Sequence, residues 1–206
     1  MRSLIVAAMI SLDGVMQAPG GPEEHTGGGF LHGGWVWPHM REEDDTMGGV
    51  FSRPYDLVLG RRTYDIFAAY WPHMPGDGSY GNIADGFNAA TKHVATHRPD
   101  TLDWRNSRAL GEDVIAALRE LKRGDSPDLV TQGSSDLVHQ LLASDLVDEL
   151  RLLVFPVLLG RGKRLFDDCA QPSAFRLAAS QTSAAGVLTT HYMRDGDVQT
   201  GTHESA

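Results

Sequence analysis

The most informative part of this chain is the stretch Asp56-Leu57-Val58-Leu59-Gly60-Arg61-Arg62-Thr63-Tyr64-Asp65. It reads as a short apolar strand that ends at a glycine and continues as a helix opening with two arginines and a threonine. Glycine permits a tight turn, and the first N–H groups of a helix have no intrahelical partner. Because these donors lie at the positive end of the helix dipole, the junction is a candidate phosphate site. A strand end followed by a solvated helix surface is the simpler alternative.

Strands and helices alternate on both sides of this stretch, which predicts an α/β fold. An apolar run at residues 4–10 suits a strand buried on both faces. Strand-like and helix-like patterns then alternate, and strand-like patterns alone close the chain. We therefore expect a mostly parallel central sheet with an antiparallel C-terminal hairpin. The expected strands are 4–10, 56–60, 92–96, 128–132, 147–159, 175–180 and 187–192, and the expected helices follow residues 60, 113 and 136.

Two further segments are expected to do more than connect these elements. Residues 18–34 are rich in Gly and Pro, which predicts a loop. A loop of that length in a compact domain is either disordered or functional, typically as a lid or pocket wall. Residues 41–51 form a modest helix candidate. Its first turn holds four consecutive acids, and acidic residues favour a helix N-terminus.

The composition restricts the class of protein. Of the 206 residues 41% are hydrophobic, enough for one domain, which we expect over residues 1–194 with a polar, flexible tail over residues 195–206. A net charge of −9 argues against nucleic acid as a partner, because phosphate backbones require basic surfaces. No run approaches the roughly 20 apolar residues that span a bilayer, and no signal peptide is recognised. We expect no membrane association and a cytoplasmic location.

Cysteine and histidine usage argues against a metal site. The single cysteine, Cys169, excludes a disulfide framework and a multi-cysteine zinc site. His32, His39, His73 and His97 lie in scattered loops without the spacing of a zinc-binding pair. We therefore expect no bound metal.

Three expected strand ends carry groups that suit an anion: Gly60-Arg61-Arg62-Thr63, Thr96-His97-Arg98 and Gly133-Ser134-Ser135. In an open α/β sheet, ligands bind beyond the carboxyl ends of the strands. Three such turns at one sheet edge predict a site for a phosphate-bearing small molecule. Neither a G-x-G-x-x-G fingerprint after the first strand nor a Walker A sequence occurs, which disfavours the Rossmann and P-loop classes.

Four motifs in order resemble the dihydrofolate-reductase-fold superfamily. They are Ser11-Leu12-Asp13-Gly14, Gly60-Arg61-Arg62-Thr63-Tyr64, Gln132-Gly133-Ser134-Ser135 and the run from Pro156 through Gly160-Arg161-Gly162-Lys163 to Phe166. Within that superfamily, the chain is most similar to the reductase domain of bacterial bifunctional riboflavin-biosynthesis proteins and to its stand-alone relatives. The resemblance runs from residue 4 to about residue 193. It implies a three-layer α/β/α fold of the dihydrofolate-reductase type.

The resemblance also implies NADPH as cofactor. The Thr63 hydroxyl and nearby backbone N–H groups are expected to meet its phosphates, and the turn that follows Gln132 its pyrophosphate. Arg98 is expected to meet the adenosine 2′-phosphate, which distinguishes NADPH from NADH. Backbone near Ala7 is expected to lie beside the nicotinamide. The implied cofactor-binding residues are Ala7, Ala8, Gly60, Arg61, Arg62, Thr63, Thr96, His97, Arg98, Gln132, Gly133, Ser134, Ser135 and Asp136.

The catalytic and substrate-binding groups are implied with alternatives. Asp13 matches an aspartate beside the family's substrate pocket, although a turn aspartate that bonds its own backbone explains it equally. The acid of dihydrofolate reductases corresponds most closely to Asp44, unless the four acids form only a solvated helix start. Residues 160–166 either bind a substrate phosphate or form a solvated hairpin loop. The implied substrate-binding residues are Asp13, Trp37, Gly160, Arg161 and Lys163.

The implied reaction is hydride transfer from NADPH to a substrate that contains a planar heterocycle. The best match is 5-amino-6-(5-phosphoribosylamino)uracil reductase of riboflavin biosynthesis. The zinc deaminase module that usually accompanies it is missing here, which leaves the substrate open. Aromatic residues at 35–37 and 70–71 could form a flat wall for a flavin-like or pterin-like ring. Dihydrofolate or pterin reduction, and nucleotide binding without catalysis, are the alternatives.

The resemblance finally implies a homodimer. In this family the C-terminal strands commonly form the interface between two copies. Leu153, Phe155 and Leu158 are therefore candidates for interface rather than core positions.

Overall fold

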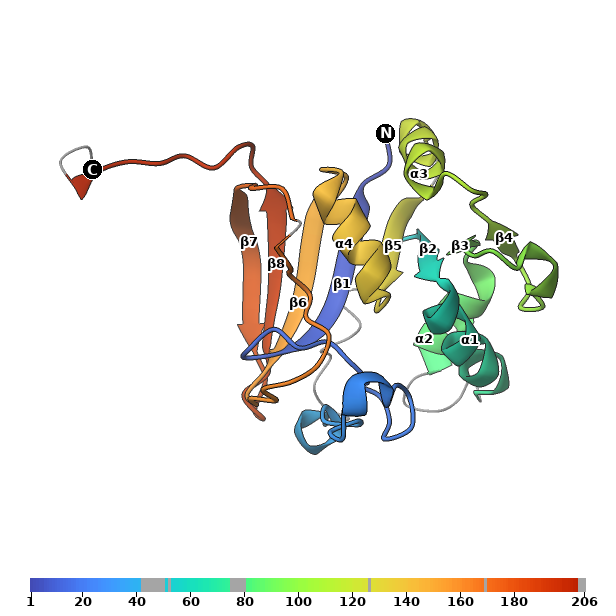
Figure 1. Cartoon of the computed structure of the whole chain (residues 1–206), viewed down its shortest axis with the longest axis horizontal. Helices are drawn as coiled ribbons and strands as arrows, with labels where there is room; N and C mark the ends of the chain where they lie inside the picture. Colours follow the sequence, from blue (N-terminus) through green and yellow to red (C-terminus); the bar gives the residue numbers. More distant parts are fainter. Residues whose placement is uncertain (42–50, 52, 75–80, 126, 169, 204–206) are drawn as a thin grey trace.

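The computed structural model describes residues 1–41, 51, 53–74, 81–125, 127–168 and 170–203. Within these residues an eight-stranded sheet forms the centre of the molecule, in the order β4-β3-β2-β5-β1-β6-β8-β7 (Figure 1). The strands from β4 to β6 in this order pair in parallel, whereas β8 is antiparallel to both β6 and β7. The strands are β1 Leu4–Ser11, β2 Tyr55–Gly60, β3 Lys92–Ala95, β4 Ser107–Ala109, β5 Asp128–Gln132, β6 Glu149–Phe155, β7 Phe175–Thr182 and β8 Leu188–Arg194. The expected mostly parallel sheet with an antiparallel C-terminal hairpin is confirmed.

Helices cover both faces of the sheet. In the described residues they are α1 Arg61–Tyr70, α2 Gly81–Ala89, α3 Val114–Arg123 and α4 Ser135–Ala143, with short 3-10 turns at Gly27–Gly29, Trp37–His39, Trp71–His73 and Pro99–Thr101. The buried residues of α3 and α4 share one hydrophobic cluster, while those of α1 and α2 belong to another. The described helices are too short or too polar to cross a membrane.

Strand β1 divides the core between the two faces. Leu4, Val6, Ala8 and Ile10 pack with α3 and α4, whereas alternate side chains pack under the loop that follows the strand. Side chains point alternately to the two faces of a strand, so a strand covered on both sides is apolar throughout. This arrangement accounts for the unbroken apolar run that opens the sequence.

Elements of poor intrinsic propensity were not predicted. Helix α2 contains two glycines, and its stability depends on Phe87, which is fully buried against Phe67 and Trp71. Strand β4 has three residues and pairs only with β3. The expected helix at 41–51 lies almost wholly outside the described residues.

The C-terminal strands differ from expectation in two respects. Strand β6 ends at Phe155, because Pro156 has no N–H to continue the ladder. Leu153 and Phe155 are buried within a single chain, so they are core residues and not interface. Leu158 is 74% exposed and stays a candidate for an interface.

Candidate functional site

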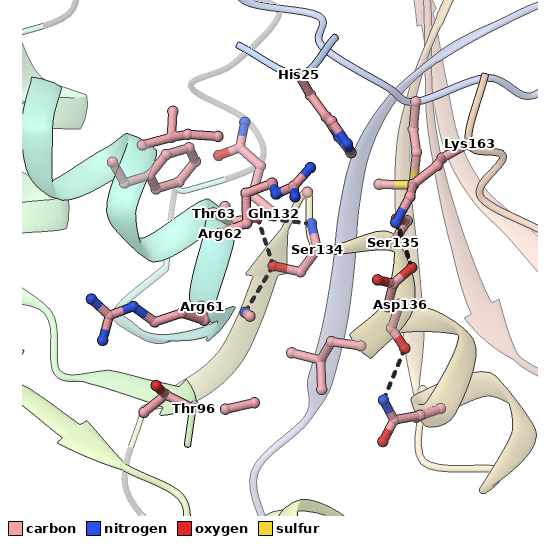
Figure 2. Close-up of a pocket in the computed structure, with 18 of the residues that line it drawn as sticks. His25, Arg61, Arg62, Thr63, Thr96, Gln132, Ser134, Ser135, Asp136 and Lys163 are labelled. Atoms are coloured by element: carbon pink, nitrogen blue, oxygen red, sulfur yellow. Dashed lines mark hydrogen bonds and ion pairs between the residues drawn. The ribbon is translucent and has the colours of Figure 1, made fainter. Parts of the chain in front are cut away.

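A cavity of about 940 Å³ opens beyond the carboxyl ends of β2, β3 and β5 (Figure 2). Met9 of β1 also lies in its wall. Its walls come from residues 16–19, 24–25, 60–63, 95–97, 111–115 and 132–137 together with Lys163. The three turns that the sequence singles out therefore face one space. This is the ligand position expected for an open α/β sheet.

Two of these turns are bonded directly to each other. The Oγ of Ser134 accepts a hydrogen bond from the Gly60 N–H at 2.9 Å and donates one to Thr63 Oγ1 at 2.9 Å. The Ser134 N–H also donates to Thr63 Oγ1, at 3.1 Å. Because that oxygen already accepts two bonds, the Thr63 hydroxyl proton remains available to an acceptor in the cavity.

The close approach of the two turns depends on glycine. Gly133 has φ 72°, and Ser134 follows in the left-handed region at φ 58°. A Cβ at Gly133 would lie 3.4 Å from the Thr63 side chain, and one at Gly60 would lie 3.2 Å from Ser134 Oγ. A side chain at Gly60 would crowd Ser134, and one at Gly133 would be strained by the positive φ at that position.

The N-terminus of α4 faces the cavity, and within the described residues the N–H groups of Ser135 and Asp136 have no hydrogen-bond partner. Asp136 in its first turn forms an ion pair of 2.8 Å with Lys163. The hydrogen bond from Lys163 lowers the pKa of Asp136 below its ordinary value. The carboxylate is therefore ionised at neutral pH, and a lysine from a distant segment balances its charge.

The two arginines at the start of α1 differ in their contacts. Arg61 donates to Asp65, to the Arg98 carbonyl and to Thr101 Oγ1, at 2.6–3.1 Å. Arg62 is exposed, lines the cavity and has no hydrogen-bond or ion-pair partner among the described residues. Arg62 is thus the guanidinium that is available to a ligand, while Arg61 braces the neighbouring loop.

The end of β3 brings Thr96 and His97 to the cavity wall. The Arg98 side chain is 62% exposed and pairs with Asp65 at 3.5 Å, outside the lining. Two acids, Glu112 and the α3 N-cap Asp113, line the same end of the cavity. Arg98 would have to leave Asp65 to meet a ligand there.

The carboxyl end of β5 contributes a buried polar group to the cavity. Gln132 lines the cavity, and within the described parts of the chain its Oε1 is buried without a hydrogen-bond partner. Ala7 is its register partner on β1, and both Ala7 and Ala8 are 3% exposed. Since an unpaired buried acceptor is unfavourable, a ligand that donates here would be stabilised.

The pattern of the RibD C-terminal domain family matches residues 2–189. The chain belongs to this family. Two uncharacterized proteins of Bacillus subtilis are similar over nearly their full length. YyaP is 24% identical, and the match covers 95% of this chain and 96% of YyaP. YwjB is 23% identical, and the match covers 94% of this chain and 98% of YwjB.

Solved structures share the RibD C-terminal domain fold. A putative riboflavin biosynthesis protein from Shewanella has a TM-score of 0.68 at 20% identity, covering 94% of this chain and 99% of its own. A pyrimidine reductase-like protein from Corynebacterium diphtheriae has a TM-score of 0.59 at 14% identity (95% and 93% covered). Enterococcus faecalis dihydrofolate reductase, complexed with NADP(H), has a TM-score of 0.58 at 16% identity (94% and 96%).

In this RibD C-terminal domain, the structure gives Asp13 a bracing position outside the cavity lining. Its carboxylate accepts hydrogen bonds from the Ser11 hydroxyl and from the N–H groups of Leu159 and Gly160, at 2.6–3.1 Å. The Ser11 hydroxyl and then the Leu159 N–H are the main reasons that its pKa falls to about 2. These contacts tie residues 11–14 to residues 159–164, so the carboxylate bonds the backbone of a distant segment, whereas the turn-aspartate alternative has it bond its own turn.

Of the other predicted substrate-binding residues, some line the cavity and some do not. Lys163 lines the cavity, whereas Gly160 and Arg161 do not belong to its described lining. Trp37 is 48% exposed and donates from Nε1 to the Gly20 carbonyl at 2.7 Å, also away from that lining. Asp44 lies outside the described residues, so its catalytic role stays a prediction.

The loop after β1 contributes residues that the sequence analysis missed. Gln17, Glu24 and His25 all line the cavity. The Gln17 amide accepts a hydrogen bond from the Lys163 N–H, a contact across 146 residues, and donates to the His25 carbonyl. Only the loop's Gly and Pro content hinted at a pocket wall. In the described residues no group of three or more potential ligands could hold a metal ion.

Proposed function

We propose that this protein is an NADPH-dependent reductase of a substrate that contains a planar heterocycle. The substrate that we favour is a pyrimidine with a ribosyl phosphate, such as 5-amino-6-(5-phosphoribosylamino)uracil. One observation carries the proposal: two turns suited to phosphate, at residues 60–63 and 133–136, are bonded to each other across one cavity. Membership of the RibD C-terminal domain family supports it.

The lining fits a dinucleotide. The Thr63 hydroxyl and the first N–H groups of α4 are donors for a pyrophosphate, and Arg62 and Lys163 add positive charge. The unpaired Gln132 Oε1 is an acceptor for a carboxamide N–H. Bound NADPH would supply the hydride, while the chain holds the phosphates and orients the nicotinamide.

The kinetic test is NADPH oxidation by the purified chain with a panel of acceptors: the phosphoribosylated aminouracil, dihydrofolate, a pterin and a quinone. We expect turnover with the aminouracil and loss of most of it in Thr63→Val. Turnover with dihydrofolate alone would favour the dihydrofolate alternative. NADPH binding without oxidation of any acceptor would contradict the enzymatic proposal.

Arg98 is the proposed source of preference for NADPH over NADH. Its guanidinium would exchange Asp65 for the 2′-phosphate, a bidentate partner of higher charge. We expect Arg98→Ala to weaken NADPH binding about tenfold and NADH binding little, measured by fluorescence titration. Equal losses for the two nucleotides would reject this role of Arg98.

A further inference from the structure

Charged and titratable side chains from four separate segments meet at one side of the cavity (Figure 2). His25 comes from the loop after β1, Arg62 from α1, Asp136 from α4 and Lys163 from the 160–166 segment. Arg62 and Lys163 are cationic and Asp136 is anionic, so the group carries one net positive charge when His25 is neutral. The function proposed above gives His25 no role.

The position of His25 is built into the fold. The Gln17 side chain donates from Nε2 to the carbonyls of His25 and Gly27, both at 2.9 Å. Its Oε1 accepts from the Lys163 N–H, so one amide holds the backbones of both His25 and Lys163. The imidazole lies against Gly27, where an added Cβ would be 2.6 Å from His25 Nε2. The ring therefore has a defined place beside the cations.

The surroundings of His25 disfavour its protonated form when no ligand is bound. Partial burial is the main reason that its pKa lies below the ordinary 6.5, and the positive charges of Arg62 and Lys163 lower it further. Asp136 acts in the opposite direction, but it is already paired with Lys163. Glu24, the neighbouring acid, accepts hydrogen bonds from the Gly20 and Gly21 N–H groups.

An anion in this part of the cavity would favour the protonated form of His25. It would offset the charges of Arg62 and Lys163 and add an attractive partner for an imidazolium. We propose that His25 is an anion-binding residue that takes up one proton from solvent when a pyrophosphate enters between Arg62 and Lys163. The proposal rests on the proposed function only in taking the pyrophosphate to be that of the nicotinamide dinucleotide.

Proton uptake makes the affinity depend on pH. A ligand that binds the protonated form better shifts the protonation equilibrium, and lower pH must then strengthen binding by the same linkage. We expect the dissociation constant of a pyrophosphate ligand to rise roughly threefold to tenfold between pH 6 and pH 8. Without a titrating ligand group, a site made only of arginine and lysine would show no such trend over this range.

The test is isothermal titration calorimetry of the full chain with ADP-ribose and with NADPH near pH 6.5, in two buffers of different ionisation enthalpy. ADP-ribose carries the pyrophosphate as a diester, which does not titrate in this range, whereas the 2′-phosphate of NADPH titrates near pH 6. We expect net uptake of roughly half a proton per ADP-ribose bound. In His25→Asn the proton uptake on binding ADP-ribose should be lost, and the dissociation constant of ADP-ribose should become independent of pH.

His32→Asn is the matched control, because His32 lies on the same loop against Phe30 and not in the described cavity lining. It should keep the proton uptake. Binding of ADP-ribose without proton uptake, or equal uptake in His25→Asn, overturns the proposal, as does failure of ADP-ribose to bind. If ADP-ribose binds with uptake but NADPH is never oxidised, the role of His25 stands and the reductase proposal fails.

Discussion

Thr63 joins the two turns of the cavity, since its hydroxyl oxygen accepts two hydrogen bonds from Ser134. Thr63→Val keeps the shape of the side chain but leaves the Ser134 N–H without its partner. We expect a loss of about 1–3 kcal/mol in the free energy of unfolding, together with about tenfold weaker NADPH binding. Urea unfolding and fluorescence titration measure the two effects.

Thr182→Val is the control for that substitution, because Thr182 is exposed on β7. It should change the free energy of unfolding by no more than about 0.5 kcal/mol. If Thr63→Val were as mild as Thr182→Val in both measurements, the junction between the two turns would not be what holds the site together.

Asp13 makes the stability of the fold depend on pH in the acid range. Its folded-state pKa of about 2 lies below the ordinary value of 3.8, chiefly because the Ser11 hydroxyl bonds the carboxylate. The ionised carboxylate therefore stabilises the fold fully above about pH 4, and this contribution is lost as the pH falls towards 2. We expect Asp13→Asn to lower the free energy of unfolding near neutral pH and to converge with the wild type near pH 2.

Urea unfolding across that pH range checks the prediction for Asp13. Asp100→Asn, at an exposed site, should follow the wild type throughout. A stability difference between Asp13→Asn and the wild type that stayed constant from neutral to acid pH would show that the charge of Asp13 is not involved.

At the scale of single residues, the turns at 60–63 and 133–136 could be predicted because each is a short contiguous motif at a strand end. Gln17 could not, since its Oε1 is bonded by the Lys163 N–H, far along the chain, and His25 could not, since Gln17 holds its carbonyl. Arg61 illustrates the same limit. Its bonds to Thr101 and Arg98 turn it to a loop that the motif does not contain.

At the scale of elements, the turn between β5 and α4 joins two parts of the cavity wall and has two successive residues with positive φ, Gly133 and Ser134. Gly133→Ala adds a Cβ 3.4 Å from Thr63 at φ 72°. We expect it to destabilise the fold by roughly 1–2 kcal/mol and to weaken NADPH binding, measured by thermal unfolding and titration. Gly196→Ala has a similar φ of 83° and open space around its Cβ. Gly196→Ala should lower the stability of the fold by a similar amount because of its positive φ, and it should leave NADPH binding unchanged.

Strongly patterned elements were predictable from the sequence, and weakly patterned ones were not. Strand β5 and helix α3 have clear apolar periods, and the Asp113 N-cap marks the start of α3. Helix α2 has glycines inside it and is held by aromatic packing around Phe87, which is visible only in three dimensions. Tertiary burial there overrides local propensity.

At the scale of the whole molecule, β7 is an open edge of the sheet (Figure 1). Residues 177–182 are exposed and carry no charge. Edges of this kind are usually protected by charges, so we predict that β7 pairs with a second copy. Analytical ultracentrifugation should find a dimer, and lysines at Leu177 and Ser180 should convert it to a monomer with little change in melting temperature.

Leu31→Lys is the control for the edge, since Leu31 is 87% exposed on another part of the surface. It should leave the dimer intact. A wild-type chain that sediments as a monomer, or a double-lysine variant that remains a dimer, would count against pairing through β7.

The cavity at residues 60–63 and 133–136 is proposed to hold a nicotinamide dinucleotide. The most direct measurement is a crystal structure of the chain grown with NADPH. We predict that its pyrophosphate lies between the first turns of α1 and α4, within hydrogen-bond distance of the Thr63 hydroxyl and of N–H groups of α4. NADPH bound elsewhere on the surface, or an empty cavity at saturating NADPH, would contradict the account.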